Sequence, residues 1–302
     1  MLDVVGVGTN SVDEVLQLSV AANEVPAGGK TRVIERRFLC GGQTATVTAA
    51  CAALGLRTGY LGAFGSDEHG QLVRSALEAC GVDVRGAVEC DAPNRGAVIL
   101  VDPRGTRTVF WHRSDRLRFP FNELRRSALD ARVVHVDDDD PELALHAATV
   151  ARAGGCVVTS DLEHAAGCAE NLIASVTYPI FEQKLPSLLT GEQDPERALR
   201  KLRRLNEGVL VMTLAEQGSV ALAGDVFHVA PAFAVNVVDG TGAGDVFRGG
   251  FIYGVLQQWS VPDTLRFANA AAAASCTKPG AIPSVPTLGA VQDLLASQPD
   301  RR

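Results

Sequence analysis

The fold of this chain is decided by Val237-Val238-Asp239-Gly240-Thr241-Gly242-Ala243-Gly244-Asp245-Val246-Phe247. A turn of small residues is followed by an apolar spacing, from Val246 to Val255, that predicts a buried helix beginning near Ala243. The first N–H groups of a helix lack an intrahelical acceptor, and the helix dipole adds partial positive charge at the same end. We therefore expect the amides of Gly242, Ala243 and Gly244 to form an anion site.

Asp245 stands in the first turn of this predicted helix, beside the anion site. A carboxylate there would repel a bound anion unless it had another task. One such task is to take a proton from a hydroxyl group that attacks a bound phosphate. The alternative is that Asp245 only complements the helix dipole. Spacing alone leaves both interpretations open.

Length and composition are those of an ordinary globular protein, with 302 residues, 46% hydrophobic and 21% charged. The net charge of -7 and the scattered basic residues argue against a nucleic-acid partner. No stretch of about 18 uncharged apolar residues occurs, which argues against a membrane partner. Seven cysteines without a C-x-x-C pair predict reduced thiols. Together these features favour a cytoplasmic protein.

The segment from Asp239 to Asp245 resembles the C-terminal signature D-T-x-G-A-G-D of the ribokinase-like (PfkB) carbohydrate kinases. Gly240 replaces the usual Thr, whereas Gly-Ala-Gly-Asp is intact. The resemblance implies an ATP-dependent kinase. In such an enzyme Gly242, Ala243 and Gly244 would stabilise the transferred phosphoryl group, and Asp245 would be the catalytic base.

The fold that the resemblance implies is a ribokinase-like α/β three-layer sandwich, with residues 1–302 as a single domain. The strand-helix-strand order from 131 to 260 also predicts a mainly parallel sheet with helices on both faces. Residues 14–38 and 95–113 interrupt that order with β material, which we expect to form a small β-sheet lid over the carboxyl ends of the main strands. In several family members such a lid pairs two subunits, so the resemblance implies a homodimer.

The sugar site is expected at two places in the first half of the chain. Gly41 to Thr46 resembles the family signature G-G-x-x-x-N, with Thr46 where Asn is common. Asp13 follows the first strand, where ligand-binding groups lie in open α/β sheets, although it could be a plain turn residue. Charged lid residues either touch the substrate or keep an edge strand soluble. The expected substrate-binding residues are Asp13, Gly41, Gly42, Thr46, Arg107 and Arg113.

The nucleotide site is expected in the C-terminal half. Residues 213–219 resemble the family's T-L-G-x-x-G segment, with Ala215 in place of Gly. The resemblance places adenine beside the Ala-rich residues 267–281, which could equally be a tightly packed core helix. The expected ATP-binding residues are Thr213, Glu216, Gly218, Thr241, Gly242, Gly244, Asn269, Cys276 and Gly280.

The metal site is the least well defined feature of the sequence. Asp161, Glu163 and Glu182 could orient Mg²⁺ through water, as acidic residues do in related kinases, or they could belong to solvated loops. The N-x-x-E pair of many family members is missing near Glu182. The run from Asp137 to Asp140 precedes Pro141 and predicts a helix N-cap in preference to a metal site. The resemblance also allows a monovalent cation such as K⁺.

These features predict ATP-dependent phosphorylation of a hydroxyl group on a small sugar or sugar acid. The lid turn Gly105–Thr108 resembles ketohexokinase-like members, whereas Trp111-His112-Arg113 would suit an anionic 2-keto-3-deoxy sugar acid. A nucleoside kinase is one alternative. A catalytically silent sugar- or nucleotide-binding regulator is the other, because the N-x-x-E pair is missing and Thr46 departs from the signature.

Overall fold

The main sheet of the computed structural model, which describes residues 1–164 and 167–299, is built from two runs of strands. The first run is parallel, in the order β10 (Val157–Asp161), β9 (Ala131–Asp137), β1 (Leu2–Val7) and β4 (Thr58–Leu61). The second run is β11 (Ile180–Phe181), β12 (Val209–Thr213), β13 (Ser219–Ala223) and β14 (Val226–Ala230). Parallel bridges from Thr159 to Tyr178 and from Leu162 to Phe181 join the runs beside β10. Among the described strands of these two runs, β13 alone runs opposite to the others, in antiparallel pairs with β12 and β14, so the mainly parallel sheet is confirmed.

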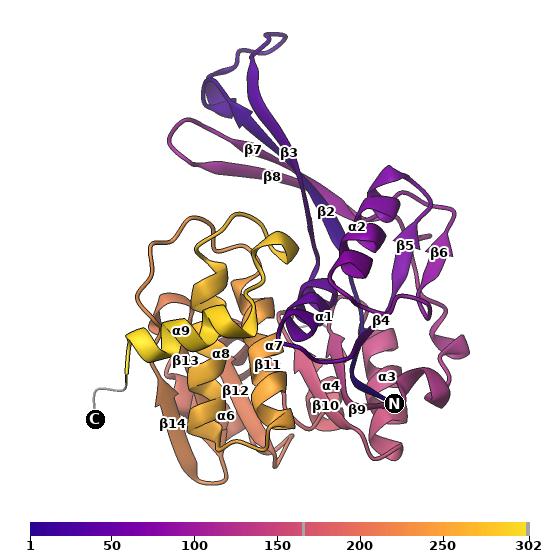
Figure 1. Cartoon of the computed structure of the whole chain (residues 1–302), viewed down its shortest axis with the longest axis vertical. Coiled ribbons are helices and arrows are strands. Elements are labelled where there is room, and N and C mark those ends of the chain that lie inside the picture. Colours follow the sequence, from indigo (N-terminus) through magenta and orange to yellow (C-terminus); the bar gives the residue numbers. More distant parts are fainter. Residues whose placement is uncertain (165–166, 300–302) are drawn as a thin grey trace.

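Helices cover both faces of this sheet (Figure 1). Successive strand residues point to opposite faces, so Val5 packs into one apolar layer and Val4 into the other. The Val5 side is covered by α3 (Pro141–Ala153), α4 (Ala169–Ser175), α5 (Leu185–Thr190) and α6 (Pro195–Leu202). The Val4 side is covered by α1 (Gln43–Ala53), α7 (Ala243–Leu256) and α8 (Val261–Ser275), with α9 (Leu288–Ser297) packed on α8. The predicted three-layer sandwich is therefore confirmed.

Helix α7 sits unusually close to its neighbours because glycines face them. A Cβ on Gly249 would lie 2.7 Å from the Ala50 Cβ of α1, and a Cβ on Gly250 would lie 2.9 Å from the Ala268 Cα of α8. Helix α1 has no polar face, and its residues 44–51 are all buried, as its composition predicts. This close packing fixes the N-termini of α1 and α7 side by side above the sheet.

A second sheet rises from the carboxyl end of the main strands as the predicted lid (Figure 1). Its strand order is β3 (Val33–Gly41), β2 (Ser11–Leu18), β7 (Gly96–Val101) and β8 (Arg107–His112). The central pair β2 and β7 is parallel and the outer pairs are antiparallel. The lid strands β2 and β3 begin and end closer to the body than the sequence predicted, because Ser11 still pairs with Gly41.

The remaining elements lie along the chain between those already described. They are β5 (Ala63–Gly65), β6 (Val88–Cys90), α2 (Glu68–Ala79) and the short 3₁₀ helices Ala22–Glu24, Phe121–Glu123, Arg126–Leu129, Ala215–Gln217 and Ile282–Ser284. All seven cysteines are unpaired. Within residues 1–164 and 167–299, no helix combines the length and apolar character needed to cross a membrane.

Candidate active site

Asp13 and Asp245 face a common pocket of about 300 Å³ between the lid and the carboxyl ends of the main strands. Asp13 comes from lid strand β2, and Asp245 from the first turn of α7. Of the residues predicted from the sequence, Gly42, Glu163, Thr241 and Gly242 line the same pocket. Its other lining residues are Thr9, Ser11, Gln43, Arg95, Gly96, Ala97, Trp111, His164 and Ala281.

The turn before α7 has the conformation that an anion site requires. Gly242 has a φ of 76°, a left-handed conformation that glycine adopts without strain. Its carbonyl oxygen accepts the N–H of Val246, which closes the first helical turn. The Ala243 N–H donates to the Gly240 oxygen at 3.2 Å, so this amide differs from the expectation of three free groups. Within the described chain, the N–H groups of Gly242 and Gly244 have no protein acceptor and remain available to an anion.

Asp239 organises this turn and links it to the lid. Its Oδ1 accepts the Thr241 N–H at 3.0 Å and the Thr241 hydroxyl at 2.7 Å, and its Oδ2 accepts the Gly280 N–H at 2.9 Å. Arg107 of β8 donates to Asp239 at 3.1 Å and to Thr241 at 3.3 Å. Burial alone would raise the pKa of Asp239, but the hydrogen bonds from Gly280 and Thr241 outweigh it and lower the pKa. Arg107 therefore contacts the turn before α7, but it does not line the pocket, which differs from the substrate contact predicted for it.

Asp245 is the carboxylate closest to this helix terminus, and its environment suits proton transfer. Burial raises the pKa of Asp245 to about 8, although the Arg248 guanidinium opposes the rise and Glu163 adds to it. A base is most effective when its pKa lies near the working pH. Asp245 can therefore accept a proton from an alcohol placed in the pocket.

The acidic run at the end of β9 accepts many hydrogen bonds from the protein, although the Oδ1 of Asp137 is buried without a partner among the residues that the structure describes. The Asp137 Oδ2 accepts the Thr9 N–H at 2.7 Å, the Thr9 hydroxyl at 2.9 Å and the Thr44 hydroxyl at 2.7 Å, which ties the end of β1 to the start of α1. Asp138 accepts the backbone N–H groups of Glu163 and His164 at 2.8 and 2.7 Å. Within the described residues, no group of three or more candidate metal ligands is found.

The second half of the acidic run neutralises two arginines. Asp139 forms ion pairs with Arg95 at 2.7 Å and with Arg113 at 2.5 Å. Asp140 accepts the N–H of Leu143 at 3.2 Å, so the predicted N-cap is confirmed. Arg113 lies on Asp139 and does not line the pocket that holds Asp245, which differs from the role predicted for it.

Two other predicted sugar contacts lie behind the pocket wall. Thr46 is fully buried, next to Gly242, and does not line the pocket, so it cannot replace the Asn of the signature as a sugar contact. The reason is helical geometry, because Thr46 faces α7 from α1. Gly41 is buried at the end of β3, where its backbone supports the position of Gly42.

Of the residues predicted to bind ATP, Thr241 and Gly242 line the pocket that holds Asp245, whereas Gly244 and the others do not. The Asn269 side chain donates to the carbonyl oxygens of Ala230 and Pro231 at 2.8 and 3.2 Å, so its amide nitrogen already has structural partners. The Thr213 hydroxyl donates to the Phe181 oxygen at 3.3 Å. Glu216 is exposed, and Gly218 and Gly280 have left-handed φ angles. The carbonyl oxygen of Cys276 accepts hydrogen bonds from the N–H groups of Val238 and Asp239. Their contact with a nucleotide remains a prediction.

The three predicted metal residues have different environments. Asp161 is fully buried and forms an ion pair with Arg248. Glu182 accepts the Lys184 N–H at 2.7 Å. Glu163 is exposed and lines the pocket beside Asp245. A single exposed carboxylate fits Mg²⁺ that is held mainly by water and phosphate oxygens, so Glu163 is the residue of the three that would hold it.

Sequence reasoning missed three residues that matter here. Arg95 and His164 line the pocket, and nothing in their local sequence distinguishes them from surface residues. Arg248 is different, because apart from Asp245 it is the charged residue of an apolar helix, and it is only 1% exposed. A buried charge requires a partner. That requirement could have identified Arg248 from the sequence.

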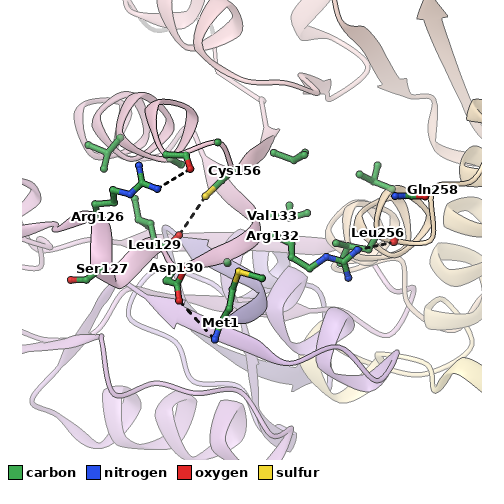
Figure 2. A pocket seen from close by; sticks show the side chains of 17 residues that line it. Met1, Arg126, Ser127, Leu129, Asp130, Arg132, Val133, Cys156, Leu256 and Gln258 are labelled. Atoms are coloured by element: carbon green, nitrogen blue, oxygen red, sulfur yellow. Dashed lines mark hydrogen bonds and ion pairs between the residues drawn. The ribbon is translucent and has the colours of Figure 1, made fainter.

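A larger cavity lies elsewhere, at the amino ends of β9 and β10, and has a volume of about 880 Å³ (Figure 2). Two of its arginines are already paired with backbone carbonyls. Arg126 donates to the Gly154 oxygen at 2.8 Å, and Arg132 donates to the Leu256 oxygen at 3.1 Å. Because ligands of open α/β sheets bind at the carboxyl ends of the strands, we assign the active site to the smaller pocket.

Comparisons with known proteins agree with this geometry. The family model described as pfkB family carbohydrate kinase matches residues 10–288. A nucleoside kinase of Methanothermobacter thermautotrophicus is 28% identical over 95% of this chain and 93% of its own. A solved Agrobacterium tumefaciens protein with the provisional name ribokinase has a TM-score of 0.89 at 26% identity, covering 98% of both chains. A fructokinase from Xylella fastidiosa, solved with bound ATP, has a TM-score of 0.83 at 23% identity, covering 99% of both chains.

Proposed function

The chain belongs to the pfkB family of carbohydrate kinases, and from this premise we propose that it transfers the γ-phosphoryl group of ATP to a hydroxyl group of a small neutral sugar. The observation that carries the proposal is the shared pocket of Asp13 and Asp245 at the N-terminus of α7. One carboxylate can hold sugar hydroxyls there while the other accepts a proton beside an anion site.

The sugar lies between the lid and the start of α1. Asp13 is half-buried, and as a carboxylate it accepts hydrogen bonds from sugar hydroxyls. Gly42 lines the same pocket and has a φ of 97°, with no room for a side chain because a Cβ would lie 2.4 Å from the Asn10 Cα. A glycine therefore lets this backbone pack against Asn10 while it lines the pocket where the sugar binds.

Phosphoryl transfer takes place at the start of α7. Asp245 accepts the proton of the attacking hydroxyl, and the N–H groups of Gly242 and Gly244 stabilise the charge that develops on the transferred group. Arg107, whose charge is paired with Asp239, reaches Thr241 from the lid and holds this turn in place. When bound, Mg²⁺ neutralises charge on the phosphate oxygens, and Glu163 is the residue placed to hold it through water. A monovalent cation remains a prediction without an assigned residue.

Charge favours a neutral sugar over a sugar acid. Arg95 lines the pocket, but its charge is paired with Asp139, as is that of Arg113. The pocket also contains the carboxyl groups of Asp13, Glu163 and Asp245. Burial raises the pKa of Asp13 and Asp245, but Asp245 is negatively charged in the ionised form that acts as the base. A substrate carboxylate would meet net repulsion, whereas hydroxyl groups would find acceptors.

A nucleoside is the second candidate substrate, because Trp111 projects from the lid into the mouth of the pocket. Its side chain is 75% exposed, and an indole face of this kind can stack on a nucleobase. If the substrate is a nucleoside, W111A should raise its KM by about tenfold. For a small sugar held by Asp13, W111A should change KM much less.

A substrate panel tests the proposal. D-Fructose, D-ribose, 2-keto-3-deoxygluconate and adenosine are each supplied with ATP and Mg²⁺, ADP release is followed, and the product is identified by mass spectrometry. We expect kcat/KM for one of the neutral sugars to exceed that for the sugar acid by at least about tenfold, since the unpaired charge of the acid costs more than 1.4 kcal/mol. Preference for the acid or for adenosine would contradict the proposed substrate class.

A homodimer formed through the lid remains a prediction, which the molecular mass in solution tests.

A further inference from the structure

Arg248 and Asp161 form a buried ion pair directly behind Asp245. Arg248 is 1% exposed and Asp161 is 0% exposed. The Arg248 guanidinium opposes the rise in the pKa of Asp245, so its positive charge acts on the Asp245 carboxyl as well as on Asp161. The three side chains come from two elements, since Asp161 ends β10 while Asp245 and Arg248 stand three residues apart on α7. The pair therefore connects the strand edge to the first turn of the helix.

The shape of α7 is adapted to this pair. Residues three apart on a helix lie on the same face, so Arg248 extends back toward the helix N-terminus and the Asp245 side. A Cβ on Gly244 would lie 2.9 Å from Nη1 of Arg248. The second glycine of Gly-Ala-Gly-Asp thus leaves room for the guanidinium as well as exposing an amide.

The Arg248–Asp161 ion pair has a counterpart in the neighbouring strand of the sheet, under α1. Asp161 of β10 is the direct neighbour of Asp137 of β9. Asp137 anchors the start of α1 through Thr44, and Asp161 anchors the start of α7 through Arg248. One acidic row along the sheet edge therefore holds both helix N-termini that form the pocket.

A buried ion pair of this kind is a costly way to stabilise a fold. Taking two charges out of water costs several kcal/mol, and apolar replacements of both partners are often neutral or stabilising. His135, which is also fully buried next to Arg248, stays neutral because burial lowers its pKa to about 3. It therefore adds no second positive charge. Stability alone does not explain why the charges of Arg248 and Asp161 are placed here.

We infer that the Arg248–Asp161 ion pair is a positioning device that holds the Asp245 carboxylate in the orientation needed to accept the proton of the attacking hydroxyl. This inference rests on the proposed role of Asp245 as the base. Arg248 and Asp161 do not line the pocket. They act through Asp245, so they should affect turnover more than the binding of either substrate.

The test replaces both charges at once, in the variant R248M/D161L. Removing one partner alone would leave a buried unpaired charge and destabilise the fold, whereas the double variant keeps an apolar, filled site. We expect its melting temperature to stay within a few degrees of wild type. With the panel's best alcohol substrate, kcat should fall about 10- to 100-fold, while KM for ATP and for that alcohol changes less than about threefold. Wild-type kcat in the folded double variant would show that the pair is only structural and would overturn the inference.

Two further variants keep the test decisive. D161N removes one charge with almost no change of shape but leaves Arg248 unpaired, so its melting temperature should fall and its kcat is measured well below that temperature. It replaces the double variant if that protein does not fold. Its kcat should also fall at unchanged KM, and a wild-type kcat would overturn the inference.

D245N separates this inference from the proposed function. If Asp245 is the base, D245N is nearly inactive and adding R248M/D161L lowers turnover no further. If D245N turns over like wild type, the proposed base is wrong and the inference falls with it. If D245N is inactive while R248M/D161L is fully active, only the inference is overturned.

Discussion

Replacing Gly242 with alanine should separate the anion site from the rest of the fold. Two effects disfavour the Cβ that an alanine would add at position 242. The backbone φ of 76° is left-handed, which costs an alanine about 1 to 2 kcal/mol. The Cβ would also lie 2.7 Å from the Ala281 Cβ and 2.9 Å from the Ala281 Cα. Ordinary contacts begin at 3.4 Å, so the turn or Ala281 must move by roughly 0.7 Å, the difference between 3.4 and 2.7 Å.

That displacement falls on the amides that hold the transferred group. Misplacing a catalytic geometry by about 1 Å can cost on the order of a hundredfold in rate. We expect G242A to lower kcat about 30- to 100-fold in an ADP-release assay and to lower the melting temperature by about 3 to 6 °C, from the backbone strain.

The matched control is G240A in the same turn. Nothing lies within 4 Å of a Cβ built on Gly240, and its φ is not left-handed. G240A should keep kcat within about twofold of wild type. If both variants lose activity equally, general loosening of the turn explains the effect. If G242A retains wild-type kcat, the anion site is not where we place it.

Three further predictions follow from single contacts. Because Asp245 must be ionised to accept a proton and its pKa is raised to about 8, kcat/KM should rise about tenfold per pH unit up to that value and then level off; a flat profile from pH 6 to 9 would contradict the base role. T44V removes the 2.7 Å hydrogen bond to buried Asp137, so denaturant unfolding should show a free energy of unfolding lower by about 2 kcal/mol, and KM for the sugar should rise. The control T48V loses only a hydrogen bond to the Ala45 carbonyl and should leave KM unchanged. A215G relieves a left-handed alanine with a φ of 49° and should raise stability by about 1 kcal/mol in the same assay; no gain would show that this alanine is unstrained.

The layers of the fold could be predicted because the signals for them are local. Glycine conformation predicts the turn before α7, and the lack of charged residues predicts that the helix from Gln43 is buried. The preference of aspartate for helix N-termini predicts the N-cap at Asp140. The lid followed from β patterns at two places where the α/β order breaks. Each of these predictions needed only neighbouring residues.

Parts of the site could not be predicted because they depend on pairs far apart in sequence. Arg113 looked available to an anion until the structure placed it on Asp139, and Asn269 looked available to a base until it reached Ala230. Thr46 stands in a sugar-binding signature, yet the close packing of α1 on α7 buries it. In each case tertiary contacts decide which polar side chains remain free.

The Asp245→Asn variant tests the central claim most directly, because it removes the proposed base with little change of shape. Wild type and D245N are compared in single-turnover phosphorylation of the best panel substrate, with ATP affinity measured separately by calorimetry. The account predicts an unchanged ATP affinity and a phosphoryl-transfer rate lower by at least about a hundredfold. A transfer rate within a few-fold of wild type would contradict it.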